Sequence, residues 1–288
     1  MPEDVETLAG VHVPVPDAEV ARAGRDERAV RDVELVVAVD PAVLVDYAVL
    51  GEVKESLFYF NEEKISEDIQ NCSDEGIQIF GGMGFSADTP MESAWRDARI
   101  ARIYEGTNEI NRMLSVGMLI KKAMKGHVDL LGPATAVGEE LMGIPGFDTP
   151  DYSEVLSEEK EMIRKLKKVF LMVAGKAVQQ FGPDLEEHQQ LLLSAADILI
   201  EVYMAESAVL RAEKNARRFG VEAQKTQIAM AQLYLYEAVD IVIRKGKEAI
   251  VSFAEGDEQR MMLMGLKRFT KYQNQPNVAA LRELIADR

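Results

Sequence analysis

A glutamate in a short turn is the residue of this chain best suited to catalysis. Glu105 follows Tyr104 and precedes Gly106 and Thr107, in a segment that we expect to be a turn between two helices. A carboxylate can remove a proton from carbon when it lies close to that proton and the developing enolate is stabilised. Taken alone, however, Glu105 is also typical of an exposed turn residue without a catalytic role.

A segment rich in glycine has the chemistry to approach an anionic cofactor. Gln78 offers an amide side chain, and Gly81 and Gly82 are small enough to let backbone amides approach a pyrophosphate. No strand is predicted before these glycines, so they are not a Rossmann fingerprint. On their own they are also typical of a helix end, because glycine readily takes the left-handed conformation found there.

A predicted helix start after the turn offers a second place for an anion. Thr107, Asn108 and Glu109 lie where the exposed amides and the positive end of the helix dipole favour negative groups. Thr107 is also suited to be an ordinary N-cap, and the two roles are compatible.

Together these segments resemble the C-terminal helical domain of the acyl-CoA dehydrogenases. The resemblance depends on the sequence WRDARIARIYEGTNEINR at 95–112, preceded by QIFGGMGF at 78–85. It is dense from Asp74 to about Gly126 and looser over about 154–288, and it is absent from the first fifty residues. Two ordered motifs at the family spacing are a far more specific signal than a lone glycine motif.

The resemblance implies a flavoenzyme that carries out α,β-dehydrogenation of fatty acyl-CoA thioesters in fatty acid β-oxidation. Glu105 would be the base that removes the α-proton, while its backbone amide donates to the thioester carbonyl. Hydride would leave the β-carbon for the flavin of FAD. Tyr104 and Gly106 would line the thioester site.

The resemblance also implies cofactor contacts and partners. Gln78, Gly81 and Gly82 resemble the segment that reaches across a homodimer to the flavin held by the partner subunit. Residues 107–109 occupy positions of flavin contacts, although many family members have Gln where this chain has Glu109. The expected electron acceptor is an electron-transfer flavoprotein. The expected compartment is the cytoplasm of a bacterium or the mitochondrial matrix of a eukaryote.

Composition excludes several other classes of protein. The net charge of −16 argues against nucleic acid, whose phosphates would be repelled at long range. Cys72 is the single cysteine and cannot form an internal disulfide. No apolar stretch approaches the roughly 20 residues that span a bilayer, and no spacing of His or Cys predicts a metal site. We therefore expect a soluble, intracellular protein.

Helix formers dominate from Lys54 onward, so the sequence predicts an all-α fold. Apolar spacing predicts helices over about 55–80, 91–101 and 108–125. Later in the chain it predicts a helix from Ser157 to the break at 182–183, long helices over about 184–219 and 223–254, and shorter ones over 259–270 and 278–286. The stripe predicted for the first helix contains Ile65, Ile69, Cys72, Gly76 and Ile79. One stripe predicted for the later helices contains Leu166, Val169, Phe170, Val173 and Ala177.

The predicted organisation has four parts. They are an anomalous N-terminal segment (1–52), the C-terminal helical domain of the family (53–126), a linker rich in Gly and Pro (127–153) and a helical extension (154–288). The extension resembles the extra domain of very-long-chain acyl-CoA dehydrogenases, which are dimers. Some of them also use it for peripheral membrane contact, although the acidic balance here argues against an electrostatic anchor.

The first fifty residues differ in composition from the rest of the chain. They contain no Lys, Ile, Asn, Gln, Ser or Phe, and thirteen of them are Val. Two interpretations stay open: a genuine acidic appendage, or translation of a GC-rich gene in the wrong frame.

The matched region corresponds to only part of a family member. The N-terminal helical domain and the middle β-domain, which holds much of the flavin, precede it in the family. A second hypothesis is therefore a catalytically inactive, truncated helical module that keeps a dimerisation or interaction surface.

Overall fold

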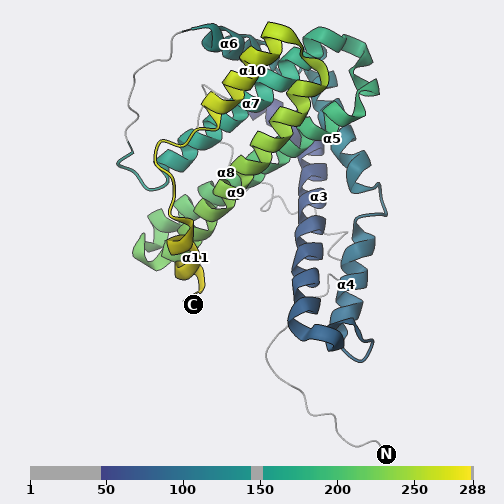
Figure 1. The fold of residues 1–288 in the computed structure, drawn as a ribbon, viewed down its shortest axis with the longest axis vertical. Coiled ribbons are helices and arrows are strands. Elements are labelled where there is room, and N and C mark those ends of the chain that lie inside the picture. Colours follow the sequence, from purple (N-terminus) through teal and green to yellow (C-terminus); the bar gives the residue numbers. More distant parts are fainter. Residues whose placement is uncertain (1–46, 144–151, 287–288) are drawn as a thin grey trace, which may run out of the picture. The chain divides into compact units, whose positions relative to one another are not determined.

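The computed structural model describes residues 47–143 and 152–286, with side chains from Glu63 onward. It confirms the all-α prediction, because no strand occurs within these two ranges (Figure 1). Of the predicted segment 1–52, residues 1–46 lie outside the described part, so both interpretations of it stay open. The helices are α3 (Tyr47–Phe80), η1 (Gly81–Phe85), α4 (Pro90–Ala101), α5 (Asn108–Met124), α6 (Leu131–Met142), α7 (Ser157–Phe181), η2 (Gly182–Glu187), α8 (Gln189–Phe219), η3 (Glu222–Gln224), α9 (Lys225–Phe253), α10 (Gly256–Phe269) and α11 (Val278–Ala286).

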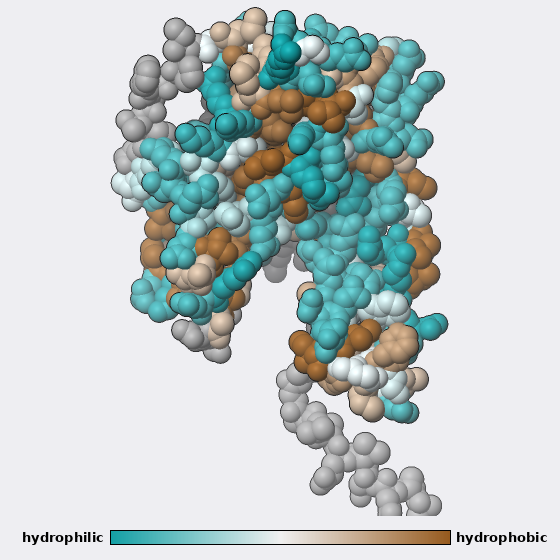
Figure 2. Space-filling view, viewed as in Figure 1, coloured by the Kyte–Doolittle hydropathy of each residue, from teal (hydrophilic) through white to brown (hydrophobic). Residues whose placement is uncertain are grey.

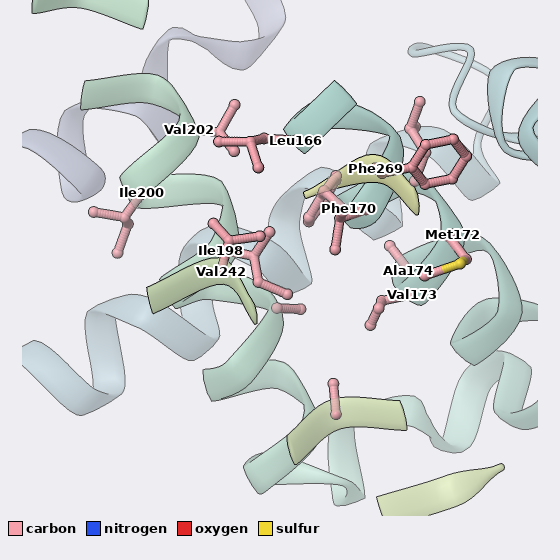
Figure 3. Packing of buried hydrophobic residues seen from close by; sticks show 14 of the residues in the cluster. Leu166, Phe170, Met172, Val173, Ala174, Ile198, Ile200, Val202, Val242 and Phe269 are labelled. Carbon is pink, nitrogen blue, oxygen red and sulfur yellow. The ribbon is translucent and has the colours of Figure 1, made fainter. Parts of the chain in front are cut away.

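A core of aliphatic side chains holds α7, α8, α9 and α10 together. All five residues of the stripe predicted on α7 are buried, which confirms that prediction. Figure 3 shows Leu166 and Phe170 of α7 packed among residues of the neighbouring helices, such as Ile198, Val242 and Phe269. Burying such side chains contributes about 1.5–3 kcal/mol each, so this core is the main source of stability in the extension.

Helix α5 connects the predicted catalytic turn to this core. Its side chains Val116, Leu119 and Ile120 are buried in the same cluster as those of α7 and α8. It also packs against α3. The turn that precedes α5 is therefore attached to the helical extension as well as to α3.

Residues 131–142 form helix α6, although the Gly and Pro residues of this region predict a linker. Pro133 lies in the first turn, where a missing backbone N–H costs nothing, and the Gly132 amide donates to Asp129 Oδ1 at 2.9 Å. The helix packs closely on α7, because a Cβ at Gly175 would lie 2.5 Å from Ala134 Cβ.

Helix α3 buries a different face from the one that its apolar spacing indicates. Ile65, Ile69 and Ile79 are exposed by 51%, 52% and 81%. The buried stripe is polar and consists of Glu63, Ser66, Gln70 and Ser73. It faces the side on which α4 and α5 pack. The helix itself was predicted correctly, but its apolar stripe lies on a surface that no described residue covers.

Exposed apolar residues continue past the end of α3. Phe80, Met83 and Phe85 are each more than half exposed, and Figure 2 shows hydrophobic residues gathered where α3 passes into α4. Such a contiguous patch is typical of a surface that contacts another protein or domain. No helix within residues 47–143 and 152–286 is long and apolar enough to cross a membrane.

Candidate functional site

The predicted turn between α4 and α5 is present, and it holds Glu105 in an unusual backbone conformation. The backbone amide of Asn108 donates to the carbonyl of Arg102 at 3.3 Å and closes the turn. Glu105 has a φ of 58°, in the left-handed region that non-glycine residues rarely occupy. Such a conformation persists only where surrounding contacts impose it, and it is common at functional sites.

Gly106 is required in this turn for two reasons. Its φ is 95°, which side chains disfavour, and a Cβ there would lie 2.5 Å from Asn111 Oδ1. Asn111 is buried, and its Nδ2 donates to the carbonyl of Gly106 at 3.3 Å. The side chain of Asn111 thus takes the space beside the glycine and supports the turn from α5.

The side chains of Tyr104 and Glu105 point away from the described helices. Tyr104 is 54% exposed and Glu105 is also exposed. Within the described residues, the backbone N–H of Glu105 makes no hydrogen bond. The carboxylate and this amide are therefore both available to a molecule bound over the turn.

Thr107 caps α5 as its residue type predicts. Its Oγ1 accepts from the amide of Ile110 at 3.3 Å. Glu109, in the first turn of the helix, is exposed, and hydrogen bonds from its own backbone amide and from the Thr107 side chain lower the pKa of its carboxyl. The start of α5, which is predicted to attract negative groups, thus already interacts with the carboxylate of Glu109 from the same helix.

Asn108 is buried and bonded to α3, although the resemblance assigns it a cofactor contact. It is 3% exposed, and its Nδ2 donates to Ser66 Oγ at 3.0 Å and to the Glu63 carbonyl at 3.4 Å. The Ser66 hydroxyl donates in turn to Asn108 Oδ1 at 3.3 Å. In this chain the side chain of Asn108 fixes the start of α5 against α3, and its cofactor contact stays a prediction.

Ion pairs hold the two helices that flank the turn. Arg102 precedes the turn and pairs with Glu67 of α3 at 3.4 Å. Arg112 pairs with the same carboxylate at 2.8 Å and with Asp197 of α8 at 2.8 Å. Sequence reasoning missed Asp197, which lies 85 residues from Arg112 in a helix without any motif.

A fully buried carboxyl group lies beside these ion pairs and was also missed. Glu63 is 0% exposed, and its Oε2 is 3.9 Å from Arg112 Nε. Burial raises the pKa of Glu63 to about 8, because the charged form loses its hydration and the Arg112 charge compensates only in part. No pattern in the sequence distinguishes Glu63 from the exposed glutamates of the same helix.

Gln78, Gly81 and Gly82 form a separate group at the far end of α4 from Glu105. A twelve-residue helix such as α4 is about 18 Å long, so these residues and the turn do not share one small site in this chain. All three are exposed. Gly81 has a φ of 61°, and a Cβ on Gly81 or Gly82 would meet nothing within 4 Å.

The exposed groups fit an anionic cofactor. The amide side chain of Gln78 and the open backbone at Gly81 and Gly82 offer N–H donors, which suit phosphate oxygens. The first amides of α5 are instead bonded within the chain. Among the described residues, no group of three His, Cys, Asp or Glu side chains could hold a metal ion. A hollow of about 960 Å³ lies between α6, α7 and α10, and its lining contains none of the predicted site residues.

These features define an all-α domain that presents a strained glutamate on a turn. Two family models, both described as acyl-CoA dehydrogenase, C-terminal domain, match residues 64–118 and 165–268. Together they cover more than half of the chain and lie on both sides of α6. The chain belongs to the acyl-CoA dehydrogenase family.

Three relatives give the extent of the similarity. A probable acyl-CoA dehydrogenase of Bacillus subtilis (strain 168) is 38% identical over 225 residues, which are 77% of this chain and 37% of that protein. The rat mitochondrial very long-chain specific acyl-CoA dehydrogenase is 26% identical over 231 residues, 72% of this chain and 33% of that protein. The human mitochondrial short-chain specific acyl-CoA dehydrogenase is 48% identical over 56 residues, 19% of this chain and 14% of that protein.

A solved structure agrees with the fold. The acyl-CoA dehydrogenase of Bacillus anthracis, crystallised in complex with FAD, matches with a TM-score of 0.73 and 38% identity. The match covers 80% of this chain and 38% of that one. This chain therefore spans about a third of the length of the relatives that match most of it.

Proposed function

We propose that this chain is the C-terminal part of an FAD-dependent acyl-CoA dehydrogenase in which Glu105 is the base. The observation that carries the proposal is the left-handed φ of 58° at Glu105, on a turn closed from both sides. The surrounding contacts impose this conformation on Glu105. Its side chain nevertheless makes no hydrogen bond to any of the described residues. A strained and unpaired carboxylate is better explained by a role toward a substrate than by a role in folding.

The residues of the turn divide the chemistry between them. The Glu105 carboxylate takes the α-proton of a fatty acyl-CoA thioester. The backbone N–H of Glu105, which has no partner in the described chain, donates to the thioester carbonyl as negative charge develops there. Tyr104 and Gly106 line the site on either side. FAD, when bound, supplies the acceptor for the hydride that leaves the β-carbon.

Two separate groups of residues would hold the cofactor. Thr107 and Glu109 lie beside Glu105 and would contact the flavin that serves this turn, with Asn108 behind them. Gln78, Gly81 and Gly82 lie about 18 Å away along α4, which is consistent with their contacting the flavin of a second subunit. This separation supports a homodimer, and the family also points to fatty acid β-oxidation with an electron-transfer flavoprotein as acceptor.

The exposed apolar surface favours a cofactor site that a further domain or a second subunit completes. Ile79, Phe80 and Phe85 are exposed by 81%, 55% and 69%, next to the glycines proposed to reach the cofactor. Covering them with a middle domain or a second subunit would also exclude water from the flavin. The same surface, together with the short span of the chain, favours the second candidate function, an inactive helical interaction module.

Flavin binding distinguishes the two candidates. We expect the purified 288-residue chain to bind FAD no better than micromolar in equilibrium dialysis, because few contacts remain to offset the entropy of ordering the cofactor. A chimera in which this chain replaces the matching region of the Bacillus subtilis relative should be yellow. A colourless chimera would favour the interaction module.

The base is tested in the same chimera. Glu105→Gln keeps the volume of the side chain and removes its basicity, so kcat should fall by at least about a hundredfold while FAD stays bound. Glu75→Gln, an exposed glutamate of α3, is the control and should leave the rate unchanged. A Glu105→Gln chimera with near wild-type turnover would assign the base to another residue.

A further inference from the structure

One carboxylate of α3 binds both ends of the turn that carries Glu105. Glu67 Oε1 lies 3.4 Å from Arg102 Nη2 and 2.8 Å from Arg112 Nη2. Arg102 is the C-cap of α4, and Arg112 lies just over one turn into α5. Because a single oxygen accepts from both guanidinium groups, it limits how far the ends of the two helices can separate.

The helical extension joins this arrangement through α8 and α9. Asp197 Oδ1 of α8 accepts from Arg112 Nε at 2.8 Å. Lys245 Nζ of α9 lies 3.0 Å from the other oxygen of Asp197. A continuous chain of charged groups thus runs from α9 through α8 and α5 to Glu67 on α3, and ends at Arg102 before the turn.

The charged groups that link α9 to Arg102 are shielded enough from water for their interactions to be strong. The Arg112 side chain is 12% exposed, and those of Asp197, Lys245 and Glu67 are 19%, 20% and 23% exposed. Charge-assisted hydrogen bonds are roughly twice as strong as neutral ones. Removing one partner also leaves the others incompletely paired.

We propose that Glu67 and Asp197 are positioning residues that hold the Glu105 turn in its left-handed conformation, and that the helical extension thereby supports the reacting carboxylate. The inference rests on the proposed role of Glu105. It gives the helical extension a second role besides packing, which is to support the turn that carries Glu105. Asp197 orients Arg112, and Arg112 together with Glu67 fixes the start of α5 relative to the end of α4.

Amide hydrogen exchange in the 288-residue chain tests this without any activity measurement. The reporter is the amide of Asn108, whose hydrogen bond to the Arg102 carbonyl closes the turn. We expect Glu67→Gln to accelerate exchange in peptides covering 102–111 by about tenfold or more. Asp197→Asn should accelerate it in the same peptides, although Asp197 lies on α8. Peptides from the middle of α7, which contributes no group to this network, should keep their wild-type exchange.

Two further variants separate positioning from a general loss of stability. Asp197→Glu keeps a carboxylate for Arg112 and should return exchange at 102–111 close to the wild-type rate. Glu206→Gln removes an ion pair of similar kind on the same helix, with Lys167 of α7 at 2.5 Å, and should leave the turn unchanged. If Glu67→Gln fails to fold, Asp197→Asn still tests the link, because it leaves Glu67 intact.

The proposal is overturned if both charge-removing variants leave exchange at 102–111 unchanged. It is also overturned if exchange rises equally in the α7 peptides, since that would be global destabilisation. These results do not depend on whether Glu105 is the base. An inactive Glu105→Gln chimera with unchanged exchange in both Glu67→Gln and Asp197→Asn would reject the positioning role and leave the proposed function standing.

Discussion

Replacing Glu63 with glutamine should remove much of the loss of stability that this chain undergoes at alkaline pH. Glu63 is fully buried, and neither of its carboxylate oxygens has a hydrogen-bond partner in the described chain. Burial raises its pKa from 4.5 to about 8, opposed by Arg112 and assisted by the carboxylates of Glu67, Asp197 and Glu109. The folded protein therefore holds the Glu63 proton at a pH where the unfolded chain has released it.

The sign and size of the effect follow from this difference in proton affinity. Stability falls as pH rises wherever the folded state binds more protons than the unfolded state, here between about pH 4.5 and 8. At about 1.4 kcal/mol for each pKa unit, the full cost above pH 8 approaches 5 kcal/mol. Between pH 5.5 and 9 the wild-type chain should lose about 3 kcal/mol more than Glu63→Gln does.

Urea unfolding followed by circular dichroism at pH 5.5, 7 and 9 measures this difference. Low protein concentration limits association through the exposed apolar surface. Glu75→Gln, on the same helix but exposed, is the matched control and should follow the wild type at every pH. If Glu63→Gln and wild type lose stability in parallel from pH 5.5 to 9, the carboxyl group is not held neutral by burial and the reasoning is wrong.

Two further substitutions test the turn and the exposed surface. Gly106→Ala should lower the free energy of unfolding by about 2 kcal/mol in urea, because its Cβ would lie 2.5 Å from Asn111 Oδ1 and its φ of 95° disfavours a side chain. Gly117→Ala is the control at an open helical position of α5, and it should be neutral or stabilising. Equal stability of the two variants would contradict the packing of Asn111. Phe85→Asp, at a residue 69% exposed, should reduce self-association measured by light scattering. Asp257→Asn, at an exposed residue of α10 outside the apolar surface, should not. Association that persists unchanged in Phe85→Asp would place the contact elsewhere.

The sequence was sufficient to predict the helices and the turn, because both depend on local signals. The last helix was predicted over 278–286 and is found at Val278–Ala286. Gly81 ends α3 with a φ of 61°, as the glycine pair indicates. Helix α6 is not apparent from the sequence because Gly132 and Pro133 are typical of loops, whereas both lie in a first turn that needs few backbone donors.

The contacts that support the turn are much less predictable than the turn itself. The motif predicts the turn at Glu105, but the partners of Arg112 depend on the packing of α5 against α3 and α8. The contact with Asp197 joins residues 85 positions apart, and neither helix carries a pattern that selects these partners. Likewise, the apolar spacing of α3 correctly indicates a helix but not which of its faces the described chain covers.

The polar face and the apolar face of α3 differ in how precisely they can position a neighbouring helix. This difference explains why the polar face is the one buried against α5. Hydrogen bonds are directional, so Ser66 bonded to Asn108 specifies one register of α5 against α3, and Glu67 specifies the spacing of the helix ends. An apolar stripe such as Ile65, Ile69 and Ile79 imposes no comparable register, because hydrophobic contact is not directional. Polar contacts therefore suit the interior of this unit, where the proposed role of Glu105 as a base requires its position to be set within about half an ångström. The apolar stripe is better suited to a surface covered by a further domain or subunit, where it contributes affinity.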